Sequence, residues 1–174
     1  MNNIKAIIGL GNIGPKYSRN RHNIGFMILD ALADKYHAHF SIEKNMEVAS
    51  ISIHDKTILL CKPQTFMNNS GEIIPNLAKK GIKSENIIVV HDELEKPFGS
   101  ITLKIGGSSK GHNGLKSIIQ FCGLEFMRLR FGIGRPESKD MVPAYVLQNF
   151  NEPEDQLYQN INKAVDMIET ELTK

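Results

Sequence analysis

The sequence predicts an α/β fold, a single domain with a mixed, mostly parallel β-sheet flanked by helices. Short apolar runs of strand length alternate along the chain with segments whose apolar residues recur at helical spacing. The 174 residues suit one hydrophobic core, so we expect residues 1–174 to form one domain. Hydrophobic residues make up 41% of the chain and charged residues 23%, proportions that exclude a disordered or fibrous protein.

The first half of the chain predicts a strand, a helix, a two-stranded hairpin and then a second helix. Residues 4–10 are an apolar run bordered by glycine, which indicates a buried strand, and residues 22–36 have the period of an amphipathic helix. Residues 47–53 alternate, and the turn at Asp55-Lys56 leads to an apolar run over 57–61, so we expect an antiparallel hairpin. Ser70 predicts the N-cap of a helix over 72–80.

The second half predicts three further strands and a C-terminal amphipathic helix. Residues 86–91 and 101–105 are strands, 115–121 a helix, and 127–133 alternate strictly, with Arg128 and Arg130 expected to face outward. Asn151 and Glu154 form a capping box before the last helix. This alternation of strands and helices favours a sheet covered on both faces.

Composition limits the classes of protein further. No stretch approaches the roughly 18 apolar residues that span a bilayer, and the N-terminus lacks a secretory pattern, so we expect a cytoplasmic protein without membrane contact. The two cysteines, Cys61 and Cys122, lie among apolar residues and are expected to be reduced and buried.

Charge is distributed unevenly. Residues 151–174 carry a net charge of −4 and residues 1–150 a net charge of +6, and all five arginines fall in the short segments 19–21 and 128–135. Arginine clusters on a basic body fit a polyanionic ligand such as nucleic acid. A solvated basic face fits the same charges equally well.

Polar residues follow the predicted strands, where an α/β sheet binds its ligands. We expect one rim to carry the following candidates: Asn12, His22, Asn68, Asp92 and Asn113. His22 is the candidate general base, and Asp92, at the end of an apolar strand, is the carboxylate that orients it. The three asparagines could hold peptide groups or an oxyanion, although each also suits a turn.

Other chemistries have weaker support. No G-x-S-x-G elbow is present and Ser70 and Ser109 are weak nucleophile candidates, so a water molecule activated by a base is the simpler hypothesis. Asp92 and Glu93 are adjacent in a strand and point to opposite faces, so we expect no metal site. We also expect no cofactor.

A dinucleotide-binding oxidoreductase is one alternative, because Gly9-Leu10-Gly11-Asn12-Ile13-Gly14 matches G-x-G-x-x-G. The fingerprint requires a helix that begins among the glycines, but Pro15 and a polar segment follow here. NAD(P) binding is therefore the less favoured hypothesis, and a non-catalytic RNA-binding module is a second alternative.

Several blocks together resemble the bacterial peptidyl-tRNA hydrolase family. They are Gly9-Leu10-Gly11-Asn12, Arg21-His22-Asn23-Ile24-Gly25, Lys62-Pro63-Gln64-Thr65-Phe66-Met67-Asn68-Asn69-Ser70-Gly71, His91-Asp92-Glu93-Leu94, Gly111-His112-Asn113-Gly114-Leu115-Lys116 and Arg128-Leu129-Arg130-Phe131-Gly132-Ile133-Gly134-Arg135-Pro136. Two departures are Ile13, where the family usually has proline, and Lys110, where it often has a small residue.

The resemblance implies hydrolysis of the ester that joins a peptide to the 3′ ribose of tRNA, which recycles tRNA in translation. It implies that His22 activates water and Asp92 orients His22. The implied substrate-binding residues are Asn12, Tyr17, Met67, Asn68 and Asn113. The implied tRNA-binding residues are Lys104, Arg130, His112 and Arg135. The partner is peptidyl-tRNA, bound at its acceptor end and 3′ terminus by a monomer without metal or an obligate protein partner.

Overall fold

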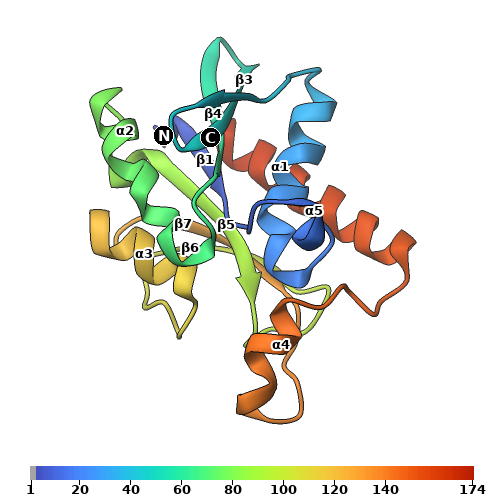
Figure 1. The fold of residues 1–174 in the computed structure, drawn as a ribbon. Coiled ribbons are helices and arrows are strands. Elements are labelled where there is room, and N and C mark those ends of the chain that lie inside the picture. The colour runs from blue at the N-terminus through green and yellow to red at the C-terminus, as the bar shows by residue number, and fades with distance from the viewer. Residues whose placement is uncertain (1–2) are drawn as a thin grey trace.

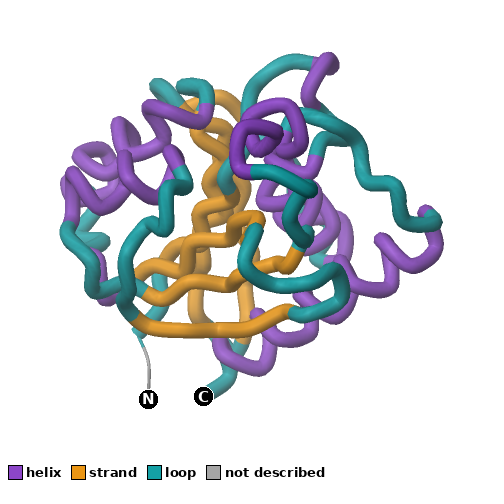
Figure 2. Tube along the Cα trace, turned by 90° about the horizontal axis from the view of Figure 1, so that it is seen from below, coloured by secondary structure: helices purple, strands orange, loops and turns teal. Residues whose placement is uncertain are grey.

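A computed structural model describes residues 3–174 as a seven-stranded sheet between two layers of helices (Figures 1 and 2). The strands are β1 (Ala6–Gly9), β2 (Ser41–Glu43), β3 (Met46–Ile53), β4 (Lys56–Pro63), β5 (Ile87–Glu93), β6 (Ile101–Ile105) and β7 (Met127–Gly132). Their order across the sheet is β2-β3-β4-β1-β5-β7-β6. The helices are α1 (Ile24–Lys35), α2 (Ile74–Lys79), α3 (Asn113–Cys122), α4 (Val142–Val146) and α5 (Glu154–Leu172).

The centre of the sheet is parallel and its edges are antiparallel. Strands β4, β1, β5 and β7 run in one direction, whereas β2 with β3, β3 with β4, and β6 with β7 pair in opposite directions. The expected hairpin is the β3–β4 pair, but its turn residues are His54 and Asp55, both with positive φ, in place of Asp55 and Lys56, because Lys56 already pairs with Ile53. The predicted α/β class, with its mixed sheet, flanking helices and C-terminal helix, is confirmed.

Each face of the sheet has its own hydrophobic core. Helices α1 and α5 cover one face, where Ile7 and Val90 point, and α2 and α3 cover the other, where Ile8 and Val89 point (Figure 1). Residues of β1 and β5 are therefore buried on both sides, as expected for central parallel strands. Among the described residues, no helix is both long and apolar enough to cross a membrane.

Two of the predicted helix caps are wrong. Ser70 lies in a 3₁₀ segment, where its hydroxyl donates to the carbonyl of Met67 at 2.8 Å, and α2 begins only at Ile74. Helix α5 begins at Glu154 after Pro153 and has no side-chain cap, so Asn151 does not form the expected capping box. Ser70 lies three residues before the N-cap of α2, Ile73, and Asn151 lies two residues before the N-cap of α5, Pro153.

Arg128 is buried, and its predicted outward orientation is wrong. The strand β7 lies inside the sheet between β5 and β6, and Arg128 is 2% exposed whereas Arg130 is half-buried, so alternation along β7 does not mark a solvent side at Arg128. The guanidinium donates to the carbonyls of Ser108 at 2.9 Å and Leu124 at 3.0 Å and lies 4.3 Å from the ring centroid of Phe126. Both cysteines are free; Cys61 is buried as predicted, whereas Cys122 is only half-buried.

Candidate active site

A cleft of about 320 Å³ opens where β5 ends, between the loop that precedes α3 and the short helix α4. His22, Asp92 and His112 line it together with apolar residues of α4 such as Val142 and Val146. His22 comes from a 3₁₀ turn, Arg21–Asn23, directly before α1, and Asp92 is the sixth residue of β5. The carboxyl edge of the parallel strands thus carries the candidate base, as predicted.

The loop over residues 106–112 does not reach the cleft directly from the end of the preceding strand, although we expected the polar residues to follow their strands at one edge. Because β6 is antiparallel to β7, its carboxyl end lies at the opposite end of the sheet from the cleft. The loop returns across the sheet through Gly106, Gly107, Lys110 and Gly111, all with positive φ, and places His112 at the N-terminus of α3. A sequence without glycine at most of these positions would be strained here.

His22, which is partly exposed, pairs with the buried Asp92. Nδ1 of His22 lies 2.8 Å from Oδ2 of Asp92, whose side chain is 2% exposed. Burial would raise the pKa of Asp92, but His22 and His112 outweigh burial and hold it well below its ordinary range. Burial disfavours the charged form of His22, but the charge and hydrogen bond of Asp92 prevail and raise its pKa above 6.5. This pairing leaves Nε2 of His22 as the nitrogen that can accept a proton.

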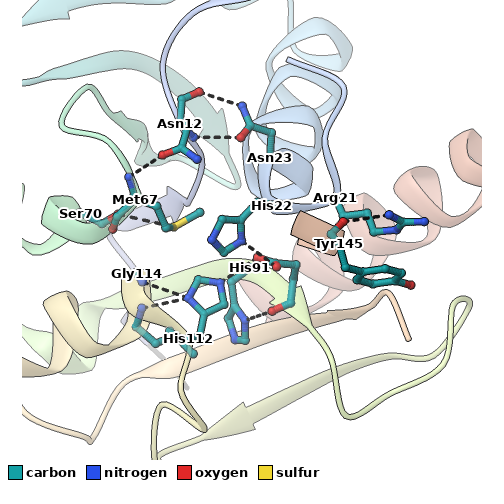
Figure 3. Close-up of polar contacts among 12 residues, drawn as sticks. Asn12, Arg21, His22, Asn23, Met67, Ser70, His91, His112, Gly114 and Tyr145 are labelled. Carbon is teal, nitrogen blue, oxygen red and sulfur yellow. Dashed lines mark hydrogen bonds and ion pairs between the residues drawn. The ribbon is translucent and has the colours of Figure 1, made fainter. Parts of the chain in front are cut away.

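His112 contacts the other oxygen of the same carboxylate. Its Nε2 lies 2.8 Å from Oδ1 of Asp92, and its Nδ1 accepts from the backbone N–H groups of Gly114 at 3.1 Å and Leu115 at 3.2 Å (Figure 3). The lone pair is therefore on Nδ1 and the proton on Nε2, which donates to Asp92. Both ring nitrogens of His112 are engaged inside the protein.

The tautomer of His112 affects how well His22, Asp92 and His112 could bind a metal ion. The ligand atoms of His22, Asp92 and His112 lie within 4.8 Å of one another, close enough to surround one ion. A metal on Nε2 of His112 would move the ring proton to Nδ1, where it would face the N–H groups of Gly114 and Leu115. The donor set therefore fits a hydrogen-bonded relay better than a metal centre.

Asn12 organises the loops beside His22. Its backbone N–H donates to Oδ1 of Asn23, whose amide donates back to the carbonyl of Asn12, both at 2.9 Å. Its own Oδ1 accepts from the N–H of Met67 at 2.7 Å (Figure 3). One asparagine thus joins the loop after β1 to the segment after β4. Asn23, which sequence analysis did not single out, could have been noticed because it directly follows His22.

Met67 packs between these loops and α3. It is 3% exposed, and a Cβ built at Gly114 would lie 2.5 Å from its Sδ atom. A side chain at position 114 would therefore displace Met67, and His112 Cε1 lies 3.0 Å from the same Cβ position.

The other predicted substrate residues differ in their distance from the cleft and in their exposure. Asn113 is exposed and lines the cleft, and Asn68 is exposed on the 3₁₀ segment Met67–Ile73. Tyr17 is half-buried in a 3₁₀ turn, Pro15–Tyr17, with the ammonium of Lys16 5.4 Å from its ring centroid. Of these three, Asn113 is the one that lines the cleft together with His22.

Basic side chains surround a smaller hollow next to the cleft. Lys104 is exposed on β6, and Arg130 is half-buried on β7 with its Nε donating to Thr102 at 3.1 Å. Together with Lys110 and Arg128 they line a pocket of about 30 Å³ beside Gly106 and Gly107. Arg135 is exposed, lines the main cleft and pairs with Glu95.

The glycine motif after β1 serves packing. A Cβ at Gly9 would lie 2.4 Å from the carbonyl oxygen of Gly25, and one at Gly11 would lie 2.8 Å from the ring of Phe26. Among the described residues, the motif is followed directly by a three-residue 3₁₀ turn, Pro15–Tyr17, and α1 begins at Ile24, so no α-helix starts among the glycines as a pyrophosphate site would require. The dinucleotide-binding alternative is not favoured.

A mixed α/β sheet with a carboxylate-paired histidine at the carboxyl edge of its strands is typical of the broad class of α/β enzymes, which bind their ligands at this edge. A family model described as peptidyl-tRNA hydrolase matches residues 6–174. The chain belongs to this family of hydrolases.

Individual relatives agree with this assignment. Peptidyl-tRNA hydrolase of Neisseria meningitidis serogroup C is 46% identical over 168 residues, which cover 94% of this chain and 86% of that protein. The protein of the same name from Hydrogenobaculum is 48% identical over 149 residues, or 84% of this chain and 79% of the relative. The crystal structure of peptidyl-tRNA hydrolase from Acinetobacter baumannii superimposes with a TM-score of 0.89 at 37% identity, covering 99% of this chain and 88% of that one.

Proposed function

We propose that this protein hydrolyses the ester between a peptide and the 3′ ribose of tRNA, with His22 as the base that activates water. The observation that carries the proposal is the 2.8 Å contact between Nδ1 of His22 and a carboxylate of Asp92 that is almost fully buried. The family match supplies the substrate class.

The reaction requires two proton transfers, one from water to His22 and one from His22 to the leaving ribose oxygen. As water attacks the ester carbonyl, its proton passes to Nε2 of His22, and Asp92 stabilises the imidazolium. When the tetrahedral intermediate collapses, the ribose oxygen leaves and recovers the proton from His22. A free peptide and an intact tRNA result. A ribose oxygen is a far better leaving group than an amine, so a single base without a covalent nucleophile suffices.

Neutral amides are proposed to hold the peptide beside the base. Asn113, exposed in the cleft, would position the water or the carbonyl. Asn12, Asn68 and Met67 would bind the peptide backbone and the last side chain, and Tyr17 would lie further along this path. A substrate with a free charged amine would bury that charge beside uncharged partners, which disfavours aminoacyl-tRNA.

The basic hollow is proposed to bind tRNA phosphates. Lys104 and Arg130 line it from neighbouring strands, and Arg135 lies at the rim of the cleft. The geometry of His112 supports a contact with Asp92 in place of its expected tRNA contact, because neither ring nitrogen is left for a phosphate. Since peptidyl-tRNA is a product of ribosomes, we place the activity in the cytoplasm and propose that a monomer acts without cofactor.

The test is the release of peptide from an N-acetylated aminoacyl-tRNA by the purified chain. We expect release that continues in the presence of EDTA and is much slower with the same aminoacyl-tRNA carrying a free amine. Binding of the RNA without any turnover would favour a non-catalytic module and contradict the proposal.

A further inference from the structure

The carboxylate of Asp92 is shared between two histidines, and the proposed reaction uses only one of them. His22 contacts Oδ2 and His112 contacts Oδ1, each at 2.8 Å, and the two rings lie 5.0 Å apart between centroids (Figure 3). A second, nearly buried imidazole thus contacts a carboxylate that already has a partner. The proposed reaction does not explain the function of this second imidazole, His112.

The N-terminus of α3 fixes the state of His112. Two backbone N–H groups, of Gly114 and Leu115, point at Nδ1, so this nitrogen presents its lone pair and the ring proton lies on Nε2. The arrangement has no place for a second proton on Nδ1. His112 therefore meets Asp92 as a neutral hydrogen-bond donor, whereas Nε2 of His22 remains able to take a proton.

We propose that His112 is a positioning residue that acts through Asp92: it holds the carboxylate in place and draws part of its negative charge away from His22, which sets the pH at which His22 becomes a base. A carboxylate that accepts a hydrogen bond at each oxygen is a weaker partner for either donor than one with a single hydrogen bond. Without His112, Asp92 would stabilise the imidazolium of His22 more strongly. This inference rests on the proposed role of His22 as the base.

Replacing His112 leaves the other titratable groups near His22 in place. From β5, His91 has its pKa lowered to about 3 mainly by burial, which remains in the variants, and to a smaller extent by His112. The remaining charged groups that line the cleft come from the end of β5, the loop before α3 and the segment before α4: Glu93, Lys110, Arg135 and Lys139. Any change in the titration of His22 is therefore assigned to the bond that is removed.

Two substitutions separate this role from simple helix capping. His112→Asn keeps an oxygen where Nδ1 accepts the N–H groups, and asparagine is a favoured N-cap, but its side chain is too short to reach Asp92. His112→Gln places an amide N–H group near the position of Nε2, so it can restore a neutral donor to Asp92. If His112 only caps α3, the pKa of His22 in His112→Asn should match the wild type. If His112 acts through Asp92, the pKa of His22 in His112→Gln should match it.

The experiment is an NMR titration of the His22 ring nitrogens in the wild type and both variants, accompanied by the pH profile of kcat/KM and by melting curves. We expect His112→Asn to raise the pKa of His22 by about half a unit or more, roughly a threefold gain in proton affinity. The acid limb of kcat/KM should move by the same amount, and His112→Gln should return both toward the wild type.

Three results would overturn the inference. One is a His22 titration that is unchanged in His112→Asn, and another is an equal shift in both variants. The third is a wild-type His112 whose ring proton is found on Nδ1, a readout that holds even if a variant fails to fold. The titration needs no substrate, so failure to hydrolyse peptidyl-tRNA would contradict the proposed function without affecting this test.

Discussion

Nδ1 of His22 lies 2.8 Å from Oδ2 of Asp92, a carboxylate with 2% of its side chain exposed, although the two residues are 70 positions apart in the chain. An ion so deeply buried is costly unless it is paired. His22 supplies that partner for Asp92, and the proposed role of His22 as a base rests on this pairing.

Replacing Asp92 with asparagine tests this pairing. The amide keeps the size of the side chain but offers no charge to an imidazolium, and it can hold His22 in the wrong tautomer. We expect kcat to fall about 10²–10⁴-fold with little change in KM. The check is steady-state hydrolysis of N-acetylated aminoacyl-tRNA, with circular dichroism to confirm folding. A folded Asp92→Asn protein with more than a tenth of the wild-type kcat would refute the role of the charge.

The pH dependence follows from the raised pKa of His22. The base must be neutral, so activity is present above the pKa of His22 and is lost as the pH falls through it. Asp92 stays ionised throughout, because its pKa is held well below its ordinary value. We expect kcat/KM to rise through one ionisation above pH 6.5 and then reach a plateau. A profile that is flat from pH 5 to pH 8 would argue against an imidazole base.

The basic hollow makes a different kind of prediction. Lys104→Ala and Arg130→Ala should each raise KM while kcat at saturating substrate stays near the wild-type value, because they remove phosphate contacts remote from the ester. Each should also reduce the slope of log KM against log salt by roughly 0.7–0.9. Lys163→Ala, at an exposed position on α5, is the matched control. If kcat rather than KM changes, these residues do not act by binding phosphate.

Arg21 is predicted to affect stability and not tRNA binding. Its side chain is buried, donates to the carbonyl of Tyr145 at 2.9 Å and lies 3.8 Å from the ring centroid of the same residue. Arg21→Met should lower the free energy of unfolding by roughly 1–3 kcal/mol, since buried acceptors lose their donor. The neighbouring exposed Arg19, changed in the same way, should cost less than about 1 kcal/mol. Urea unfolding of both variants measures the difference, and equal losses would contradict this assignment.

The fold was largely predictable because central strands, which are buried on both faces, appear in the sequence as short continuous apolar runs. The strand predicted over residues 86–91 is β5, which ends two residues later, and the predicted hairpin is the β3–β4 pair with its turn displaced by one residue. The direction of β6 was not predictable, because an edge strand has the same composition in either orientation. For this reason the return of residues 106–112 across the sheet was not predicted.

For the site, sequence analysis predicted the approach of His22 and Asp92 but not the arrangement around them. The side chains of Arg21 and Arg128 are buried and donate hydrogen bonds to carbonyl groups that are distant in sequence. The clustering of charges in the sequence could not predict these contacts. The second hydrogen bond to Asp92 depends on where α3 begins, since the N-cap position of His112 turns its ring toward the carboxylate.

The most direct test of the account is the hydrolysis of N-acetylated aminoacyl-tRNA by His22→Ala. The exposed His39, changed to alanine, is the control. If His22 is the base, the variant should fold normally, bind tRNA with wild-type affinity and lose about 10²–10⁴-fold in kcat, whereas His39→Ala should match the wild type. A folded His22→Ala protein that retains full activity would contradict the mechanism.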